Sequence, residues 1–333
     1  MEIITQYLDD LATQGRSPAT IRAVRADLRQ FAAWWETTQH QPWMVELTSD
    51  RDLRRWQRHR QVEDGAAPAT INRALSTLRR FCTWAVKHGY LIDNPTVNLQ
   101  DVATESIGPQ ALPAVAVDAL LRVARQQDEP RRSRDEALLA LLIYTGVRAQ
   151  EACDVQLRDL DLGAGTLTVR SGKGRKARRL PLHPDAVRLL ERYLTLVRCP
   201  QGLPPLGSDE ERMPVLVRID PATTGRPVTP GITARGVGKV ITRLGRRAAT
   251  LLRESAAKVA DLQRRDALLM AAQRLDAVAP HQLRHSLARR LLTQGAQLPE
   301  VQRILGHSRL STTGMYLTPS EDDLRSAIDR IQI

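Results

Sequence analysis

Near its end the chain reads His281-Gln282-Leu283-Arg284-His285, followed by Leu305-Gly306-His307 and, nine residues further on, by Tyr316. Arginine offers planar, paired donors that match two phosphate oxygens. Tyrosine offers a phenol oxygen that could form a covalent phosphoester bond. The combination of an arginine, imidazoles and a phenol is therefore suited to a phosphodiester.

A second stretch lies in the middle of the chain, where Thr145-Gly146-Val147-Arg148 precedes Glu151 and a turn, Gly172-Lys173-Gly174, follows. The segments 165–170 and 177–182 flank this turn, which predicts a β-hairpin with Lys173 at its tip. The middle stretch thus adds a second guanidinium and an ammonium to the set.

Charge patterning indicates a polyanionic partner. The 333-residue chain holds 49 Lys+Arg against 37 Asp+Glu, a formal net charge of +12, and residues 112–333 carry the whole excess. Two runs, Arg170–Arg179 and Arg226–Arg253, contain basic residues and no acidic one. Such runs can be ordinary solvated faces, but their place in the half that carries the motifs favours contact with phosphates. A protein this basic is expected to meet nucleic acid or an anionic membrane surface.

Other classes of protein are disfavoured by what the sequence lacks. Cys82, Cys153 and Cys199 are odd in number and far apart, unlike a zinc site, so we expect buried thiols in a reducing compartment. The first residues lack the pattern of a signal peptide, and no apolar run approaches the ~20 residues of a membrane span. The motifs contain no carboxylate cluster to hold a metal. We therefore expect a cytoplasmic protein without a membrane partner, a metal or a cofactor.

The first hundred residues contain a weak internal repeat, because Pro18-Ala19-Thr20-Ile21 recurs as Pro68-Ala69-Thr70-Ile71. Each copy has apolar residues at helical spacing with proline near the start, where its missing N–H costs little. With further helices near 3–12 and 50–61, the sequence predicts a four-helix unit. Its aromatic stripe is expected to be core rather than a platform for stacking bases.

Prolines and glycines at 93–113 predict a hinge. Beyond it the sequence predicts a mainly α-helical domain around the small β-hairpin, with a long surface loop at 199–231. The expected helices lie near 117–126, 134–144, 184–197, 234–277 (with a candidate break near 253–255), 282–294, 298–305, a short one ending around 316, and 322–331. The last of these is amphipathic, and its apolar face consists of Leu324, Ala327, Ile328 and Ile331.

These motifs resemble, in identity, order and approximate spacing, those of the tyrosine recombinase (phage integrase) family. The resemblance implies a two-domain, C-shaped DNA clamp, in which 1–105 is a helical core-binding (SAM-like) DNA-binding domain and 106–333 the catalytic domain. It also implies that Tyr316 attacks a phosphate to form a 3′-phosphotyrosyl link, while Arg148 and Arg284 clamp the phosphate oxygens. Lys173 would protonate the leaving 5′-oxygen, a role for which Lys176 competes.

The resemblance implies further roles and partners. His281 would act as an acid or base near the nucleophile, His307 would bind a phosphate oxygen, and Glu151 and His285 would orient the others. The expected partners are duplex DNA with a specific recombination site and further copies of the chain, as a tetramer on paired sites. The terminal helix would exchange between those copies. The residues expected to contact DNA are Arg79, Arg80, Arg170, Arg175, Lys176, Arg178, Arg179, Arg235, Lys239 and Arg243.

Two other functions stay open beside site-specific recombination. A type IB topoisomerase-like nicking-closing enzyme would use similar chemistry without a tetramer, and a catalytically silent relative would bind DNA alone. The complete residue set disfavours the silent relative, and the separate helical domain with the terminal helix favours recombination. Integration, excision and resolution are not distinguished. An extra arm-binding domain is expected to be absent, which favours an element-encoded integrase or resolvase or a Xer-like resolvase.

Overall fold

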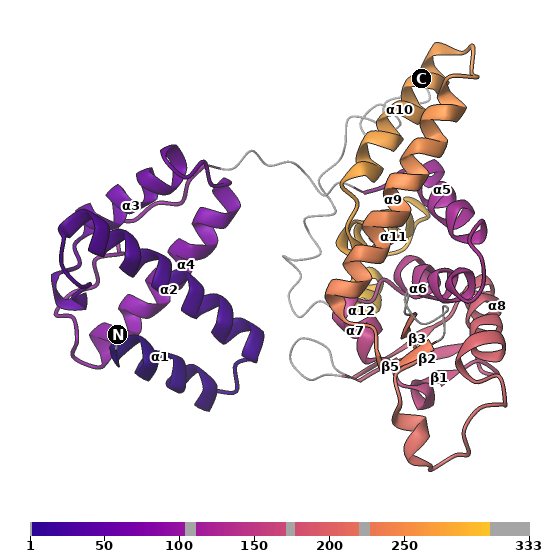
Figure 1. The fold of residues 1–333 in the computed structure, drawn as a ribbon, viewed down its shortest axis with the longest axis horizontal. Coiled ribbons are helices and arrows are strands. Elements are labelled where there is room, and N and C mark those ends of the chain that lie inside the picture. The colour runs from indigo at the N-terminus through magenta and orange to yellow at the C-terminus, as the bar shows by residue number, and fades with distance from the viewer. Residues whose placement is uncertain (1, 104–110, 171–176, 220–226, 307–333) are drawn as a thin grey trace. The chain divides into compact units, whose positions relative to one another are not determined.

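The computed structural model describes residues 2–103, 111–170, 177–219 and 227–306, with the backbone alone at 227–230. The chain divides into two compact units, Met1–Ser106 and Ile107–Ile333. Both are mainly helical, and the described part of the second also holds two small antiparallel sheets (Figure 1). This confirms the predicted fold class of a mainly α protein with a small β-hairpin.

Four helices form the first unit, and local capping explains where they begin. Ser17 accepts a hydrogen bond from the Thr20 amide and Pro18 occupies the first turn, which starts the second helix. A capping box between Ser49 and Asp52 starts the third. The helices are α1 Glu2–Thr13, α2 Pro18–Gln39, α3 Asp50–Val62 and α4 Pro68–Lys87, with a 3-10 turn at Val45–Leu47.

Aromatic side chains form the core of this unit, as the stripe predicted. Phe31, Trp56 and Phe81 are fully buried, and the Phe31 ring meets Trp56 edge-on with centroids 5.5 Å apart. Rings packed in this way contribute more than their buried area alone. The aromatic stripe therefore packs the helices against one another, and its buried rings do not form a surface for stacking bases.

Both ends of the predicted hinge at 93–113 are packed into the units that they adjoin. Leu99 is buried in the first core, and Asn72 exchanges two hydrogen bonds with the backbone of Val102. On the other side, the Leu112 amide donates to Ser286 Oγ at 2.8 Å. Residues 93–103 thus belong to the first unit and 111–113 to the second, and residues 104–110 lie outside the described residues.

The second unit contains the predicted hairpin. Strands β2 (Thr166–Val169) and β3 (Arg178–Pro181) pair antiparallel, with Leu167 opposite Leu180, and β1 (Leu160–Asp161) adds a third strand. The tip with Lys173 lies outside the described residues. The helices are α5 Ala114–Arg125, α6 Arg131–Thr145, α7 Ala149–Asp154, α8 Pro184–Tyr193, α9 Ala234–Ala256, α10 Leu262–Asp276, α11 Pro280–Thr293 and α12 Leu298–Leu305; short helical turns lie at Leu157–Asp159, Leu194–Arg198 and Asp209–Arg212.

The expectation of a surface loop at 199–231 holds for 200–213, which are mostly exposed, and was wrong for the residues that follow. Strands β4 (Val217–Ile219) and β5 (Pro227–Gly231) pair antiparallel within it, and Val215 and Leu216 are fully buried. Tyr193, at the end of α8, donates its hydroxyl to the Val215 carbonyl and accepts from the Val217 amide. These buried contacts draw the segment against the helical core despite its prolines and glycines.

The long helical stretch at 234–277 is two helices. α9 ends at Ala256 and Asp261 caps the start of α10, so the break lies a few residues after the expected position. The two helices run side by side (Figure 1). A side chain at Gly245 would come within 2.2 Å of Val278 and 2.6 Å of the Leu275 carbonyl, which is why glycine occupies that crossing.

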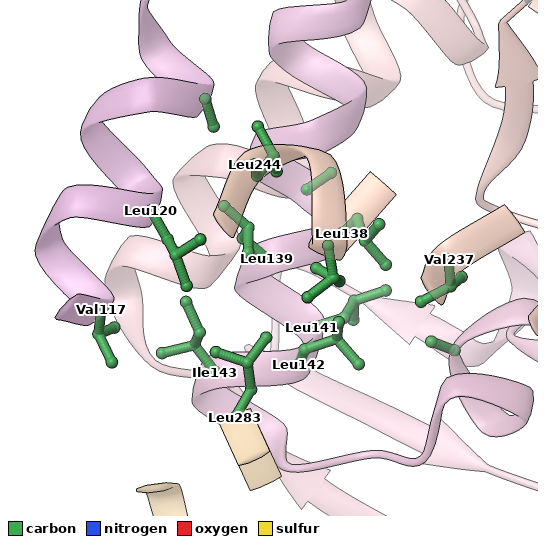
Figure 2. Close-up of a cluster of buried hydrophobic side chains, with 14 of the residues drawn as sticks. Val117, Leu120, Leu138, Leu139, Leu141, Leu142, Ile143, Val237, Leu244 and Leu283 are labelled. Carbon is green, nitrogen blue, oxygen red and sulfur yellow. The ribbon is translucent and has the colours of Figure 1, made fainter. Parts of the chain in front are cut away.

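Helix α6 lies at the centre of the second unit; it is buried on all sides from 133 to 143, and residues 137–143 are all apolar. Figure 2 shows its leucines meeting Leu120 of α5, Leu244 of α9 and Leu283 of α11. A helix buried all round is held in place by every neighbour. The C-terminal end of α6, where the Thr145-Gly146-Val147-Arg148 stretch begins, is therefore firmly positioned. The helices predicted around 316 and at 322–331 lie outside the described residues.

Candidate active site

Arg148 and Glu151 are placed by the turn that follows α6. Gly146 ends that helix in the left-handed region, with φ 62°, and Arg148 is the residue before α7. The Glu151 carboxylate accepts from the Arg148 amide at 2.9 Å and from its Nη1 at 3.0 Å. One carboxylate thereby fixes both the backbone and the guanidinium of Arg148.

Glu151 is buried between two arginines. Arg178 of β3 donates Nη1 and Nη2 to the two carboxylate oxygens, at 3.0 and 2.8 Å. Burial by itself raises the pKa of Glu151, but the hydrogen bonds from Arg178 and the Arg148 amide, with both positive charges, outweigh it and hold the pKa below its ordinary value. Glu151 is therefore ionised and serves to orient the arginines.

Arg284 reaches the same place from α11. Its side chain is buried, and its Nη1 and Nη2 donate to the carbonyls of Gly146 and Leu305, both at 2.5 Å. A side chain at Gly146 would lie within 2.9 Å of Leu287 and 2.8 Å of Leu305. The turn after α6 and the end of α12 can thus approach Arg284 only because residue 146 is glycine.

The end of α12 is held by arginines on both sides. Arg178 Nε donates to the Ile304 carbonyl at 3.2 Å, and Arg284 binds the next carbonyl. Gly306 ends the helix with φ 66°, and a side chain there would lie 2.9 Å from the Arg178 guanidinium. Cations at a helix C-terminus are favoured by the exposed carbonyls. The next residue in the chain is His307.

Two histidines share the helix of Arg284. His281 lies exposed in the first turn of α11, and His285 follows one turn later, half-buried. Burial, and then the charges of His281 and Arg284, lower the pKa of His285. His285 is therefore neutral near neutral pH and can accept a hydrogen bond or a proton.

The structure thus brings together Arg148, Glu151 and Arg284, and places His281 and His285 on the helix of Arg284. The remaining expected site residues, Lys173, Arg175, Lys176, His307 and Tyr316, lie outside the described residues. The described part of the chain holds no group of three His, Cys, Asp or Glu arranged for a metal ion. In the same part, no helix is both long and apolar enough to span a membrane.

The residues expected to contact DNA fall into different surroundings. Arg235, Lys239 and Arg243 lie exposed at four-residue spacing on α9. Arg170 and Arg179 are also exposed, although Arg170 pairs with Asp159 and Arg179 donates to Thr166. In the first unit Arg79 binds Asp101 and the Leu99 carbonyl, while Arg80 is exposed.

Arg178 differs from the other expected DNA contacts. Its side chain is 11% exposed and its guanidinium binds Glu151 and Ile304. The sequence carried a signal for the inward orientation of Arg178, because side chains two residues apart in a strand share a face. Arg178 therefore lies on the face of the buried Leu180, while Arg179 lies on the other.

The sequence profile of the phage integrase family matches residues 110–214 and 235–322, and that of the phage integrase N-terminal SAM-like domain matches residues 4–89. The chain therefore belongs to the phage integrase family of tyrosine recombinases, which confirms the resemblance seen in the motifs.

Several relatives are named as tyrosine recombinases. The chain is 32% identical over 328 residues to tyrosine recombinase XerC of Corynebacterium efficiens, an alignment that covers 98% of this chain and 90% of that protein. It is 31% identical over 326 residues to tyrosine recombinase XerD of Xanthomonas campestris pv. campestris, with coverage of 98% and 90%.

Solved structures share the fold at low sequence identity. The Tn1549 transposon integrase, solved in complex with transposon right end DNA, has a TM-score of 0.67 at 18% identity, with 99% of each chain covered. The XerH site-specific recombinase, bound to a palindromic difH substrate, has a TM-score of 0.65 at 19% identity and covers 95% of this chain and 81% of that one.

Proposed function

We propose that this chain is a site-specific DNA recombinase that cleaves and rejoins duplex strands through a 3′-phosphotyrosyl intermediate at Tyr316. The observation that carries the proposal is the approach of Arg148 and Arg284, whose motifs are far apart in the sequence. Arg284 donates to the Gly146 carbonyl, two residues before Arg148, and to the Leu305 carbonyl, two residues before His307. The family to which the chain belongs supports the same reaction.

The proposed reaction exchanges one phosphoester bond for another. The Tyr316 oxygen forms a bond to the scissile phosphorus as the bond to the 5′-oxygen breaks. The phenolic proton leaves to a base, for which His281 is the candidate, and the leaving 5′-oxygen takes a proton from Lys173. The phosphotyrosine retains the energy of the bond, so religation needs neither a nucleotide nor a metal ion.

Arg148 and Arg284 are proposed to neutralise the charge that builds on the phosphate oxygens. Donors fixed in advance stabilise such charge best, since they need no rearrangement during the reaction. Glu151 fixes Arg148, and two backbone carbonyls fix Arg284. A guanidinium carries five N–H donors, so anchoring by carbonyls is compatible with binding a phosphate.

The proposed partners are duplex DNA and further copies of the chain. Exposed basic residues on α9 and the net charge of +12 support phosphate contacts by the second unit. We propose that Met1–Ser106 is the core-binding domain and Ile107–Ile333 the catalytic domain of a clamp, and that segment 320–333 exchanges between four copies on paired sites. Relatives named tyrosine recombinase XerC and tyrosine recombinase XerD support recombination rather than scattered nicking.

Covalent trapping on DNA tests this proposal. The full chain is incubated in EDTA with sheared genomic DNA from cells that encode it, and DNA that stays bound after denaturation is sequenced. We expect one short sequence, or one family of related sequences, to be recovered at the cleavage point. Its insertion into two plasmids should then support strand exchange between them.

The other functions predict different outcomes. A topoisomerase-like enzyme would give adducts scattered over many sequences and would relax supercoiled plasmid without pairing sites. A silent relative would retain DNA without a covalent bond, and retention would be lost on denaturation. Either result would contradict the proposal of site-specific recombination.

A further inference from the structure

Arg178 stands apart from the other described residues expected to contact DNA because its side chain points inward from the hairpin. It donates Nη1 and Nη2 to Glu151 and Nε to the Ile304 carbonyl. Its partners are 27 and 126 residues away in the sequence, so no local helix or turn explains the contacts. The guanidinium therefore joins three separate segments of the chain.

Each of these segments leads to a residue of the proposed reaction. β3 begins five residues after Lys173 in the sequence, Glu151 fixes Arg148 at 3.0 Å, and Ile304 lies in the last turn of α12, three residues before His307 in the sequence. Arg178 thus shares the Glu151 carboxylate with Arg148, while Lys173 is close to it along the chain and His307 is close along the chain to its partner Ile304. A planar guanidinium can make these three directed bonds at once, whereas a lysine ammonium offers one point of charge on a flexible chain.

We propose that Arg178 is a positioning residue for strand cleavage, which acts through Glu151 on Arg148 and through the Ile304 carbonyl on the C-terminal end of α12. This inference rests on the proposed function and assigns to Arg178 a role other than a DNA contact. The side chain is 11% exposed and all three kinds of guanidinium nitrogen are engaged within the protein.

Close packing supports the same assignment. The Gly306 backbone lies flat against the guanidinium, so that a side chain at position 306 would be 2.9 Å from its central carbon. Loss of the guanidinium leaves one side of Glu151 and the Ile304 carbonyl without their partner. Since a shift of about 1 Å in a reacting group can slow a reaction on the order of 10²-fold, such a loss should be visible in the cleavage rate.

The test compares Arg178→Gln and Arg178→Lys with a control, Arg188→Gln. Arg188 also forms an arginine–carboxylate pair, with Asp185 at 2.8 Å, but its side chain is 69% exposed on α8. The probe is a synthetic duplex of the sequence recovered by covalent trapping. We expect both Arg178 variants to bind it as the wild type does and to cleave it on the order of 10²-fold more slowly, with the control unchanged.

A second substrate separates positioning from a general effect on the fold. In this duplex a methylphosphonate replaces the scissile phosphate, which removes the charge that Arg148 and Arg284 are proposed to neutralise. If Arg178 acts through Arg148, its loss should slow cleavage of the neutral duplex much less than cleavage of the charged one. If Arg178→Gln does not fold, Arg178→Lys provides the same comparison of cleavage rates on the two duplexes.

Three results would overturn the inference. Equal defects on the two duplexes would make Arg178 a purely structural residue. A weaker affinity with a smaller salt dependence would make it a DNA contact. Normal cleavage by both variants would leave it without a role. Failure of the wild type to form any adduct with the charged duplex would instead reject the proposed function, so the two failures are distinguishable.

Discussion

Gly146 is the residue on which the candidate site most directly depends. It ends α6 in the left-handed region, lets Leu287 and Leu305 approach the turn, and offers its carbonyl to Arg284. Glycine adopts this backbone conformation without strain and has no side chain to exclude the neighbours. A single small residue thus allows two distant motifs to meet.

Replacing Gly146 by alanine should destabilise the second unit by about 2–5 kcal/mol, the combined cost of left-handed strain and overpacking. Gly295→Ala is the matched control, since Gly295 also has a positive φ, of 92°, but a methyl group there would have no described neighbour within 4 Å. The control should lose only about 1–2 kcal/mol. Urea unfolding of both variants measures the difference, and equal losses would contradict the close approach.

His285 gives the site a pH-dependent stability. Because its pKa is lowered in the folded protein, the unfolded chain takes up a proton first as the pH falls. Stability is therefore fully present above the ordinary histidine pKa of about 6.5 and decreases as the pH falls below it. Glu151 also has a lowered pKa, so it acts in the same direction, but below the ordinary carboxyl value of about 4.3.

Between about pH 7 and pH 5.5 the loss of stability should therefore reflect His285 rather than Glu151. We expect His285→Gln to lose less stability over this interval than the wild type. Urea midpoints at the two pH values give the comparison. Equal pH dependence in the two proteins would show that His285 is not buried among like charges.

At the scale of elements, α6 and α9 are joined by a buried carboxylate. Asp135 of α6 is fully buried and accepts from Arg134 Nε at 2.5 Å, Arg243 Nη2 at 2.6 Å and Gln127 Nε2 at 2.9 Å. A buried charge requires such partners, since burial without them is costly. The network also fixes the α9 face that carries Arg235 and Lys239.

Asp135→Asn should destabilise the second unit by about 3–5 kcal/mol, because the buried Arg134 loses its counter-charge. The control is Asp209→Asn, whose carboxylate is 95% exposed and pairs with Arg212 at 3.7 Å. Exposed pairs contribute about 0–1 kcal/mol, so the control should unfold almost as the wild type does. A small effect of Asp135→Asn on the urea midpoint would mean that the Asp135–Arg134 pair is not needed for the stability of the second unit.

Elements differ in how far the sequence predicts them. The helices of the first unit and the β2–β3 hairpin follow from local periodicity and capping. The sequence analysis missed β4 and β5 because prolines and glycines dominate 199–231. The apolar pair Val215 and Leu216 within this segment is too short to predict a buried strand. The Arg178–Glu151 pair joins residues 27 apart, and such partners become visible only when the elements are packed.

At the scale of the whole molecule, each unit has a hydrophobic core of its own. One core contains Cys82 and the other Cys153. Burial raises the pKa of both thiols to about 12, with a smaller contribution from Asp154 at Cys153. The two cysteines therefore stay protonated and covered while their units are folded.

Each thiol should consequently report the unfolding of its own unit. We expect iodoacetamide at mildly alkaline pH to label neither Cys82 nor Cys153 in native buffer, and to label them at separate urea concentrations. Peptide mapping of the labelled chain measures both. Rapid labelling of both thiols without urea would contradict the two buried cores.

The central claim is that Tyr316 forms the covalent bond to DNA. The most direct measurement digests the trapped protein–DNA complex with protease and nuclease and identifies the peptide that carries the nucleotide by mass spectrometry. The account predicts a 3′-nucleotide on Tyr316, formed in EDTA and absent from Tyr316→Phe, which still binds the same DNA. A nucleotide on any other residue, or an adduct formed by the Phe variant, would contradict it.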